Sequence, residues 1–260
     1  MASAPKYHLG FGRDDLGEPF PTLALLSGDP QRAFRIARAT EGVRCEKTLS
    51  ENRGLPSYLV SFPDGRRMLS ATSGIGAPSL SIVVNELVDV GIRHIIRVGT
   101  SGAIQDEVEV GSVVITQAAL CRQGAARDIA PVEYPAAANP FLTVALVEAA
   151  QSLGVPWHLG VTASVDTFYE GQERVESSVN KHLLRWLRGI TEEYRHLGIL
   201  NYEMECGTLL KMGGVYGFAA ACVCAVVAGR SRSEHVVQEA RQQAEENAIR
   251  VAVQAARSFA

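Results

Sequence analysis

Short apolar runs of strand type alternate along this chain with stretches of helical period, and this alternation limits the fold more than any other feature. The strand-like runs lie at 22–28, 94–102, 111–120, 158–168 and 218–229, and the run at 94–102 ends in a predicted turn. The helical patterns lie at 29–40, 77–91, 139–154 and from 236 onward. Strands that alternate with helices form sheets covered by helices on both faces. We therefore predict an α/β fold, a three-layer α/β/α sandwich with a mixed central sheet. No linker divides the chain, so we expect a single domain over residues 1–260.

Local signals set the ends of several predicted elements. Asp29 and Asn139 are each followed by a proline, which predicts an N-cap and a first helical turn. The tripeptide PDG at 63–65 lies between two strand-like runs and predicts a hairpin. We interpret 175–197 as a polar helical zone and RHLGILN at 195–201 as the end of a helix.

Composition excludes several classes of function. The chain has 25 Lys and Arg against 28 Asp and Glu, a net charge of −3, which gives no general reason to bind nucleic acid or an anionic membrane. The N-terminus lacks the apolar segment of a signal peptide, and the run at 217–229 is too short to span a bilayer. We expect a cytoplasmic protein. Five scattered cysteines, without a CxxC pair, argue against disulfides and a zinc site.

Three loops near predicted strand ends share one kind of chemistry. They are SGDPQR (27–32), with Gly28 and Arg32, TSGIGAPS (72–79), and RVGTSG (97–102), with Arg97 and Thr100. Glycine turns that expose N–H groups, hydroxyl donors and arginines suit a tetrahedral oxyanion. Each loop alone is ordinary turn material. Three in succession, without a general basic excess, predict a site for a phosphate-sized anion.

The loop after the strand-like run at 158–168 carries groups that suit a planar base. Phe168 offers an aromatic face, Gln172 an amide, and Arg174 a cationic donor. Such groups can stack on a heterocycle with carbonyl and N–H edges and read those edges. Taken alone, however, this segment is also compatible with a solvated surface loop.

The segment NYEMEC (201–206) places Glu203 and Glu205 at a predicted helix start. Two acids near a helix N-terminus are favoured by the helix dipole, without any further role. Alternatively, one carboxylate accepts the protons of a sugar diol while Met204 provides an apolar surface for the sugar. Anion, sugar and heterocycle together are the parts of a nucleoside and phosphate. The residues indicate phosphorolysis, although a hydrolase could use most of the same pocket.

These motifs resemble the nucleoside phosphorylase-I family in sequence and in order. The matching segments are YHLG (7–10), GDPQR (28–32), SGIGAPS (73–79), RVGTSGAI (97–104), GVTASVDTFYEGQER (160–174) and NYEMEC. DTFYEGQER is specific to the pyrimidine branch. The resemblance covers almost the whole chain. It implies a pentosyltransferase of pyrimidine salvage and catabolism that reversibly converts uridine and phosphate to uracil and ribose 1-phosphate.

The resemblance also implies a role for each matching residue. It assigns the phosphate site to Gly28, Arg32, Arg53, Arg97 and Thr100, with Arg53 donated by a neighbouring subunit. It assigns ribose to His8, Met204 and Glu205, with His8 reaching across a dimer interface. We expect Glu203 to support the ribose site, through a partner such as Arg97. It assigns the base to Phe168, Gln172, Arg174 and Arg230. Arg97, Arg174 and Glu205 are the expected catalytic residues.

The same resemblance bears on partners and alternatives. It implies a homodimer that shares active sites, leaves open assembly into a hexamer, and requires no metal or organic cofactor because phosphate is a co-substrate. Purine-specific relatives carry an Asp after the last core strand, whereas 226–233 holds no acid here. Gly229 and the surroundings of Arg53 depart from the usual pattern. A nucleosidase of the same fold and a non-catalytic nucleoside-binding module are the alternatives, and the full arginine set favours the phosphorylase.

Overall fold

The strands and helices were located in a computed structural model that describes residues 4–229 and 238–259. The strands are β1 (Leu23–Ser27), β2 (Arg44–Ser50), β3 (Ser57–Ser61), β4 (Arg67–Thr72), β5 (His94–Ala103), β6 (Val113–Arg122), β7 (Trp157–Val165), β8 (Ile199–Glu203) and β9 (Ala219–Gly229). The α-helices are α1 (Pro30–Arg38), α2 (Ala77–Val90), α3 (Gly124–Arg127), α4 (Pro140–Ser152), α5 (Ile190–His196), α6 (Cys206–Tyr216) and α7 (Gln238–Phe259). Short 3₁₀ helices occur at Arg13–Leu16, Asn52–Gly54 and Arg185–Leu187.

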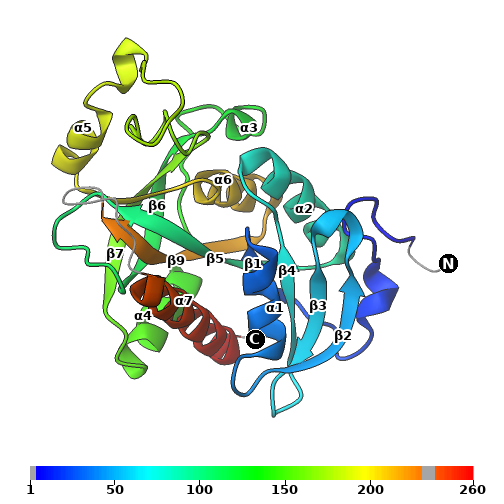
Figure 1. Cartoon of the computed structure of the whole chain (residues 1–260). Coiled ribbons are helices and arrows are strands. Elements are labelled where there is room, and N and C mark those ends of the chain that lie inside the picture. The colour runs from blue at the N-terminus through cyan, green and yellow to red at the C-terminus, as the bar shows by residue number, and fades with distance from the viewer. Residues whose placement is uncertain (1–3, 230–237, 260) are drawn as a thin grey trace.

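The nine strands of the described residues belong to one sheet, in the order β2-β3-β4-β1-β5-β8-β7-β6-β9 (Figure 1). Strands β1, β4, β5 and β9 run in one direction, while β6, β7 and β8 run in the opposite one. Because β9 also pairs with β5, the strands β5, β8, β7, β6 and β9 form a closed ring. The predicted mixed sheet is confirmed, and its closure is a feature that the sequence did not indicate.

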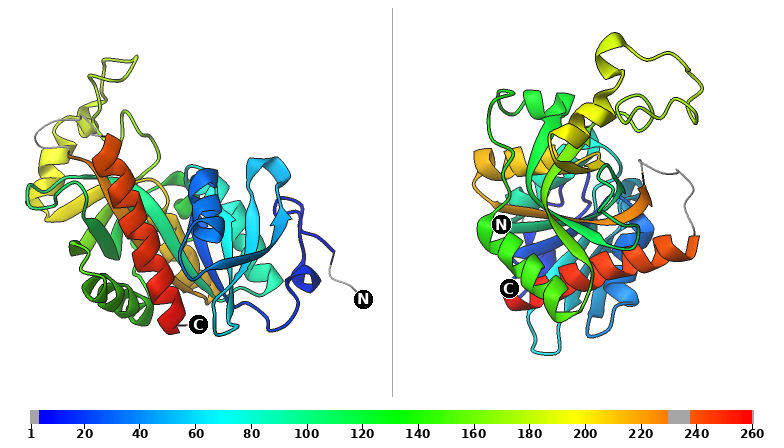
Figure 2. Two further views of the ribbon diagram at one scale, coloured as in Figure 1. Left: turned by 60° about the horizontal axis from the view of Figure 1, so that its bottom comes forward. Right: turned by 90° about the vertical axis from the view of Figure 1, so that its left-hand side faces the viewer.

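Alternate residues of the central strands face two different helical layers (Figures 1 and 2). In β1, Leu23 and Leu25 pack in the cluster that contains residues of α1, α4 and α7, whereas Ala24 and Leu26 pack with α2 and α6. In β9, Ala221, Val223 and Ala225 lie in the first of these clusters, and Ala220, Cys222 and Cys224 lie in the second. A strand buried on both faces is apolar throughout and does not alternate. The predicted α/β/α layers are therefore confirmed.

The predicted local signals at three places are also confirmed. The side chain of Asp29 accepts a hydrogen bond from the Gln31 N–H at 2.9 Å, and α1 begins at Pro30. Asn139 caps α4 through two bonds of 3.1 Å to the amides of Phe141 and Leu142. Strands β3 and β4 pair antiparallel around the turn at 63–65.

Other local predictions were wrong or incomplete. The zone at 175–197 holds only a 3₁₀ turn and the seven residues of α5. The segment 195–201 does contain a helix end, since α5 ends at His196, but it also contains the start of β8, which was not predicted. RVGTSG at 97–102 is not a turn but part of β5, because β9 pairs with β5 along its whole length. Tertiary pairing overrides local propensity at these places.

The segment between β7 and α5 projects from the body of the molecule, as Figure 2 shows in both views. Several of its apolar side chains are exposed, including Val179, Leu184 and Trp186. Of the helices within the described ranges, none combines the length and the apolar character needed to cross a membrane.

Candidate active site

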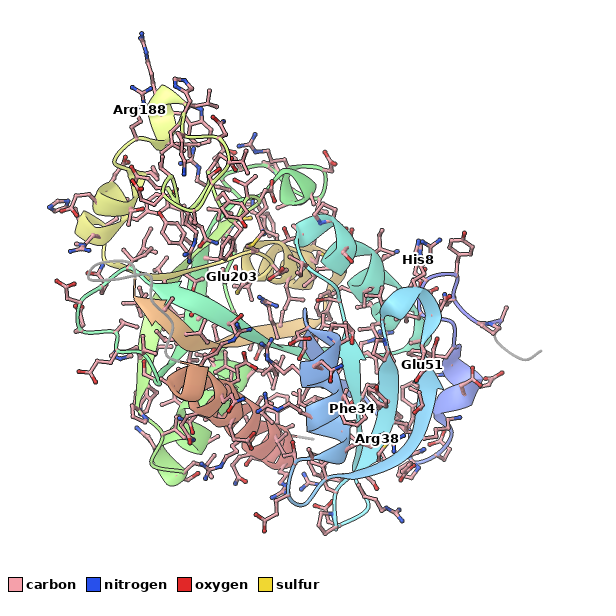
Figure 3. All side chains as sticks on the ribbon, in the orientation of Figure 1. His8, Phe34, Arg38, Glu51, Arg188 and Glu203 are labelled. Atoms are coloured by element: carbon pink, nitrogen blue, oxygen red, sulfur yellow. The ribbon has the colours of Figure 1, made fainter. Side chains whose placement is uncertain are left out.

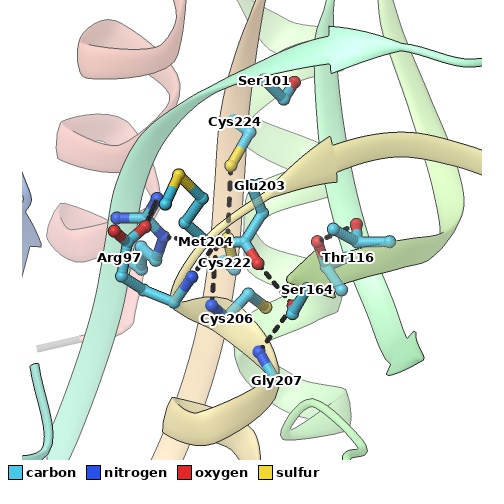
Figure 4. A network of polar contacts seen from close by, with 12 residues as sticks. Arg97, Ser101, Thr116, Ser164, Glu203, Met204, Cys206, Gly207, Cys222 and Cys224 are labelled. Carbon is cyan, nitrogen blue, oxygen red and sulfur yellow. Dashed lines mark hydrogen bonds and ion pairs between the residues drawn. The ribbon is translucent and has the colours of Figure 1, made fainter. Parts of the chain in front are cut away.

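A buried arginine, Arg97, lies at the centre of a cluster of carboxylates (Figure 4). Its Nε donates to Oε2 of Glu203 at 3.0 Å, and its Nη2 forms an ion pair with Oε2 of Glu205. Burial alone lowers the pKa of Arg97, but the charges of Glu205 and Glu203 outweigh burial and raise it well above its ordinary value. Arg97 is therefore a permanent cation held in a defined orientation.

The antiparallel pairing of β5 and β8 brings these groups together. Gly102 pairs with Tyr202 and Ala103 with Asn201, so the chain that follows Tyr202 runs back along β5 toward Arg97. Glu203 ends β8, and Glu205 is the N-cap residue of α6. The two acids of NYEMEC thus belong to different elements, one a strand and the other a helix start.

Both carboxylate oxygens of Glu203 are used within the protein. Oε1 accepts the hydroxyl proton of Ser164, and Oε2 accepts the amides of Glu205 and Cys206, each at 2.8 Å, in addition to Arg97. The Ser164 hydroxyl accepts the Gly207 amide at 2.8 Å. Glu203 therefore satisfies the first amides of α6, which a helix cannot satisfy by itself. It joins β5, β7 and α6 in one network.

Glu205 differs from Glu203 in its surroundings. Its Oε1 accepts the amide of Gly76 at 2.5 Å, from the glycine-rich loop before α2. Burial raises the pKa of Glu205, Arg97 opposes this rise, and the neighbouring Glu203 adds to it, so that the pKa lies above its ordinary value. Oε1 accepts the Gly76 amide and Oε2 pairs with Arg97, whereas Oε2 of Glu203 has three donors. Each oxygen of Glu205 therefore keeps an acceptor position for a ligand.

Arg32 and Gly28 lie beside Arg97 and make up the expected anion side of the site. Nη1 of Arg32 donates to the carbonyl of Val98 at 3.4 Å, and Nη2 lies 3.6 Å from Oε1 of Glu245. Burial lowers the pKa of Arg32, which Glu245 partly offsets. Among the described residues, Nε of Arg32 is buried without a hydrogen-bond partner. A buried N–H left unpaired here is ready for an anionic acceptor.

Two glycines permit this close arrangement. A Cβ on Gly28 would lie 3.2 Å from the Gly74 carbonyl oxygen and 3.9 Å from Nη1 of Arg97. A Cβ on Gly99 would lie 2.8 Å from Nη2 of Arg97, so the arginine can fold over β5 only because residue 99 has no side chain. Thr100 follows on the same strand and is half-buried.

The loop that was predicted to read a base leaves β7 next to Glu203. Ser164 pairs with Glu203 in the parallel β7–β8 ladder, and the loop begins two residues later. Nε of Arg174 donates to Oε1 of Gln172 at 3.1 Å, and both side chains are buried. The Arg174 guanidinium lies 4.3 Å from the centre of the half-exposed Phe168 ring. Amide, cation and aromatic face thus form one unit.

Two predicted residues lie elsewhere in the chain. Figure 3 shows His8 at the edge of the molecule, well apart from Glu203. Arg53 lies in the same place as His8, because its Nη2 donates to the Tyr7 hydroxyl at 3.1 Å and Asn52 donates to the carbonyls of Tyr7 and His8. Nδ1 of His8 lies 2.6 Å from Glu86. Arg230 lies outside the described residues.

The sequence reasoning missed several residues that hold the site. Gln123 is fully buried, donates to the Met204 carbonyl at 2.5 Å and accepts the amide and hydroxyl of Thr208. Ser164 had no local signal beyond its place on a strand. The Gly76 amide lies in the loop 72–79, which was assigned to the anion site, but no pattern singled out that one N–H. Met204 itself is half-buried between Glu203 and Glu205.

The remaining chemistry of the region is apolar. Cys206, Cys222 and Cys224 are fully buried free thiols beside Arg97, and burial raises the pKa of Cys206 and Cys222. Across 4–229 and 238–259, no three His, Cys, Asp or Glu side chains are grouped to hold a metal ion.

The sequence resembles known proteins over almost its whole length. Residues 22–257 match the family model described as the phosphorylase superfamily. The chain is 40% identical over 257 residues to a uridine phosphorylase of Escherichia coli, covering 99% of each chain. It is 38% identical over 230 residues to a uridine phosphorylase of Thermococcus kodakarensis, covering 88% of this chain and 79% of the relative. A guanosine phosphorylase of Halorubrum lacusprofundi is 30% identical over 263 residues, which cover 98% of each chain.

Proposed function

Because this chain belongs to the phosphorylase superfamily, we propose that it catalyses the reversible phosphorolysis of uridine to uracil and ribose 1-phosphate. The main observation in support is that Arg97 forms an ion pair with Glu205 and also lies near the guanidinium of Arg32. Two buried arginines next to a carboxylate fit an anion that lies against a hydroxyl-rich sugar. The relatives at 40% identity, which are named uridine phosphorylases, support this substrate.

In the proposed mechanism, phosphate lies against Gly28, Arg32, Arg97 and Thr100. One phosphate oxygen forms a bond to C1′ of the ribose while the C1′–N1 bond breaks and its electron pair moves to uracil, which then takes up a proton. Phosphate is also the counter-charge for the ribosyl cation that develops. Because bound phosphate and uridine are held in line, much of the acceleration comes from positioning. Phosphate is a co-substrate, and we propose no metal or organic cofactor.

The two hydroxyls of the ribose diol are proposed to donate hydrogen bonds to the carboxylate of Glu205, and the side chain of Met204 is proposed to pack against the sugar. Glu203 acts through Arg97 and through the start of α6, since its oxygens are already used by protein donors. Gln172 and Arg174 bind the edge of uracil, which carries negative charge in the transition state. Phe168, which stacks with the Arg174 guanidinium, offers the face for the ring. Arg230 completes the base pocket in this proposal.

The active protein is proposed to be a homodimer in which each subunit completes the site of the other. His8 and Arg53 lie together at an edge of the chain that carries neither Arg97 nor Glu205. This separation is what donation across an interface requires: His8 would reach the ribose and Arg53 the phosphate of the partner subunit. We further propose that residues 1–260 form a single domain and that the protein acts in the cytoplasm. It is proposed to have no nucleic-acid or membrane partner.

A nucleosidase is the second candidate function, and it needs only water where the phosphorylase needs an anion. The paired Arg32 and Arg97 favour the phosphorylase, because two buried cations have no role in activating water. The test is uridine turnover with and without phosphate, with the sugar product identified. We expect turnover only with phosphate and a sugar phosphate as product. Rapid release of free ribose in phosphate-free buffer would contradict the proposal.

Base recognition has its own test. Gln172→Ala should reduce the preference for uridine over inosine, because the amide that reads the pyrimidine edge is lost. An unchanged ratio of kcat/KM for the two nucleosides would show that the base assignment is wrong.

A further inference from the structure

Glu173 lies between the two base-binding residues, in a backbone conformation that glutamate rarely adopts. Its φ is +55°, in the left-handed region, and Arg53 is the one other non-glycine residue with positive φ in the part of the chain that the structure describes. Such a conformation is strained for a residue with a side chain and persists only where its surroundings hold it. Because Glu173 lies directly between Gln172 and Arg174, contacts that hold its backbone also affect the positions of those two residues.

The side chain of Glu173 provides the hold. Oε1 accepts the Gly189 amide at 2.5 Å, and Oε2 accepts the Thr191 amide at 3.1 Å. Gly189 is the N-cap residue of α5 and Thr191 lies in its first turn, so neither amide has a partner within that helix. The contact also joins the two ends of the projecting segment 174–188, so the carboxylate closes the neck of that segment.

The helix that receives Glu173 is firmly anchored. Ile190 and Tyr194 of α5 are buried in a cluster with Val165 of β7 and Tyr202 of β8. The Thr191 hydroxyl lies 3.1 Å from the Tyr202 hydroxyl. Tyr202 immediately precedes Glu203, so the anchor reaches the strand that carries the Arg97 network. The base loop and the ribose side of the site thus share one support.

We propose that Glu173 is a positioning residue that fixes Gln172 and Arg174 for the base, by clamping the loop to α5. This inference rests on the proposed function, since it assumes that the two side chains bind the base of a nucleoside. It assigns to Glu173 no contact with substrate. Its loss therefore changes affinity for the nucleoside and leaves the phosphate side intact.

The test compares Glu173→Ala with Glu170→Ala, a matched loss of a carboxylate from the same loop. The side chain of Glu170 accepts a long bond of 3.4 Å from the Ser178 hydroxyl. We expect Glu173→Ala to raise KM for uridine about tenfold, as the loss of a bidentate charged contact implies, and to change KM for phosphate less than about twofold. Glu173→Gln, which keeps one acceptor oxygen, should fall between Glu173→Ala and the unmodified enzyme.

Three outcomes would overturn the inference. One is a uridine KM for Glu173→Ala that equals that of Glu170→Ala, and another is an equal rise in KM for both substrates. The third is hydrogen exchange at the Gly189 and Thr191 amides that is as slow in Glu173→Gln as in the unmodified protein. Hydrogen exchange needs no activity, so it also decides the matter if Glu173→Ala fails to fold. It further separates failure of the clamp from failure of the proposed function, which would show as absent uridine cleavage in the unmodified enzyme.

Discussion

Nε of Arg97 donates to Oε2 of Glu203 over 3.0 Å, although the two residues are 106 positions apart in the chain. The same oxygen accepts two amides from the start of α6, and the other oxygen accepts the Ser164 hydroxyl. One carboxylate therefore fixes both the arginine of the site and the helix that begins with Glu205. The division of work between Glu203 and Glu205 follows from this arrangement.

Glu203→Gln should affect stability more than Glu205→Gln does. Loss of the Glu203 charge breaks a buried ion pair and weakens three further hydrogen bonds, so we expect a free energy of unfolding lower by about 3 kcal/mol. Glu205→Gln should cost less stability but reduce kcat/KM for uridine about 100-fold, because the acceptor for the ribose diol is lost. Urea unfolding and steady-state kinetics on both variants measure the contrast. The reverse order of stabilities would contradict it.

Gly99→Ala should displace Arg97. The added Cβ would lie 2.8 Å from Nη2 of Arg97 and 2.9 Å from Sγ of Cys224, which is closer than real Cβ atoms approach. We expect a loss of stability of about 1–3 kcal/mol from overpacking, with KM for phosphate raised more than KM for uridine. Thermal unfolding and the two KM values check this. A variant with normal phosphate affinity would show that Arg97 has room to move.

Arg32→Ala and Arg35→Ala form a matched pair on one helix. Arg32 is buried beside Arg97, while Arg35 pairs with Glu245 and Glu246 and is 31% exposed. Arg32→Ala should raise KM for phosphate about 30-fold, the size of one lost charge-assisted contact. Arg35→Ala should leave it within about threefold, because the partners of Arg35 are the carboxylates of Glu245 and Glu246 and not groups of the expected phosphate site. Equal effects of the two substitutions on phosphate affinity would argue against Arg32 as a ligand.

The free energy of unfolding should depend on pH through the carboxyl group of Glu205. Burial raises the pKa of Glu205 above its ordinary value of 4.5, so above pH 4.5 the folded state keeps a proton that the unfolded state has released. Stability relative to Glu205→Gln should therefore fall as the pH rises from 4.5 through the raised pKa, and then level off. Urea unfolding of both proteins between pH 4.5 and about pH 7 measures the difference. A difference that grows in favour of the unmodified protein would have the wrong sign.

Shared active sites predict that two inactive variants restore each other. Arg53→Ala would damage the site of the partner subunit, whereas Glu205→Gln damages the subunit's own site. A mixed dimer then holds one site with both changes and one site with neither. After random reassociation of equal amounts, about a quarter of all sites should be intact. Activity that stays at the level of the separate variants would rule out donation of Arg53 across a dimer interface.

The sequence predicted the elements whose signals are local. Helices α1 and α4 begin where Asp29 and Asn139 indicated, because a cap and a proline act within one turn. β2 was missed because most of its residues are exposed and polar at the edge of the sheet. β8 was missed because its five residues lie between two predicted helical segments, and only pairing with β5 and β7 makes them a strand.

The site was predictable as a set of groups but not as a geometry. Glycine loops and arginines indicate an anion site by their chemistry, and a carboxylate is compatible with a sugar diol. The pairing of Arg97 with Glu203 and Glu205, by contrast, depends on β8 running antiparallel to β5, which no local pattern contains. Gln123 and Ser164 escaped notice for the same reason, since their partners are 81 and 39 positions away in the sequence.

The closed ring of strands also determines when, during synthesis of the chain, the fold can be completed. β5 is made early, yet it pairs with β8 and β9, which leave the ribosome about a hundred residues later. Until then, Arg97 lacks both counter-charges, and burial of an unpaired guanidinium is too costly for a finished core. Completion of the fold and completion of the site are therefore the same late event. A chain that stops short cannot persist as a well-folded but inactive subunit able to join, and disable, an intact partner.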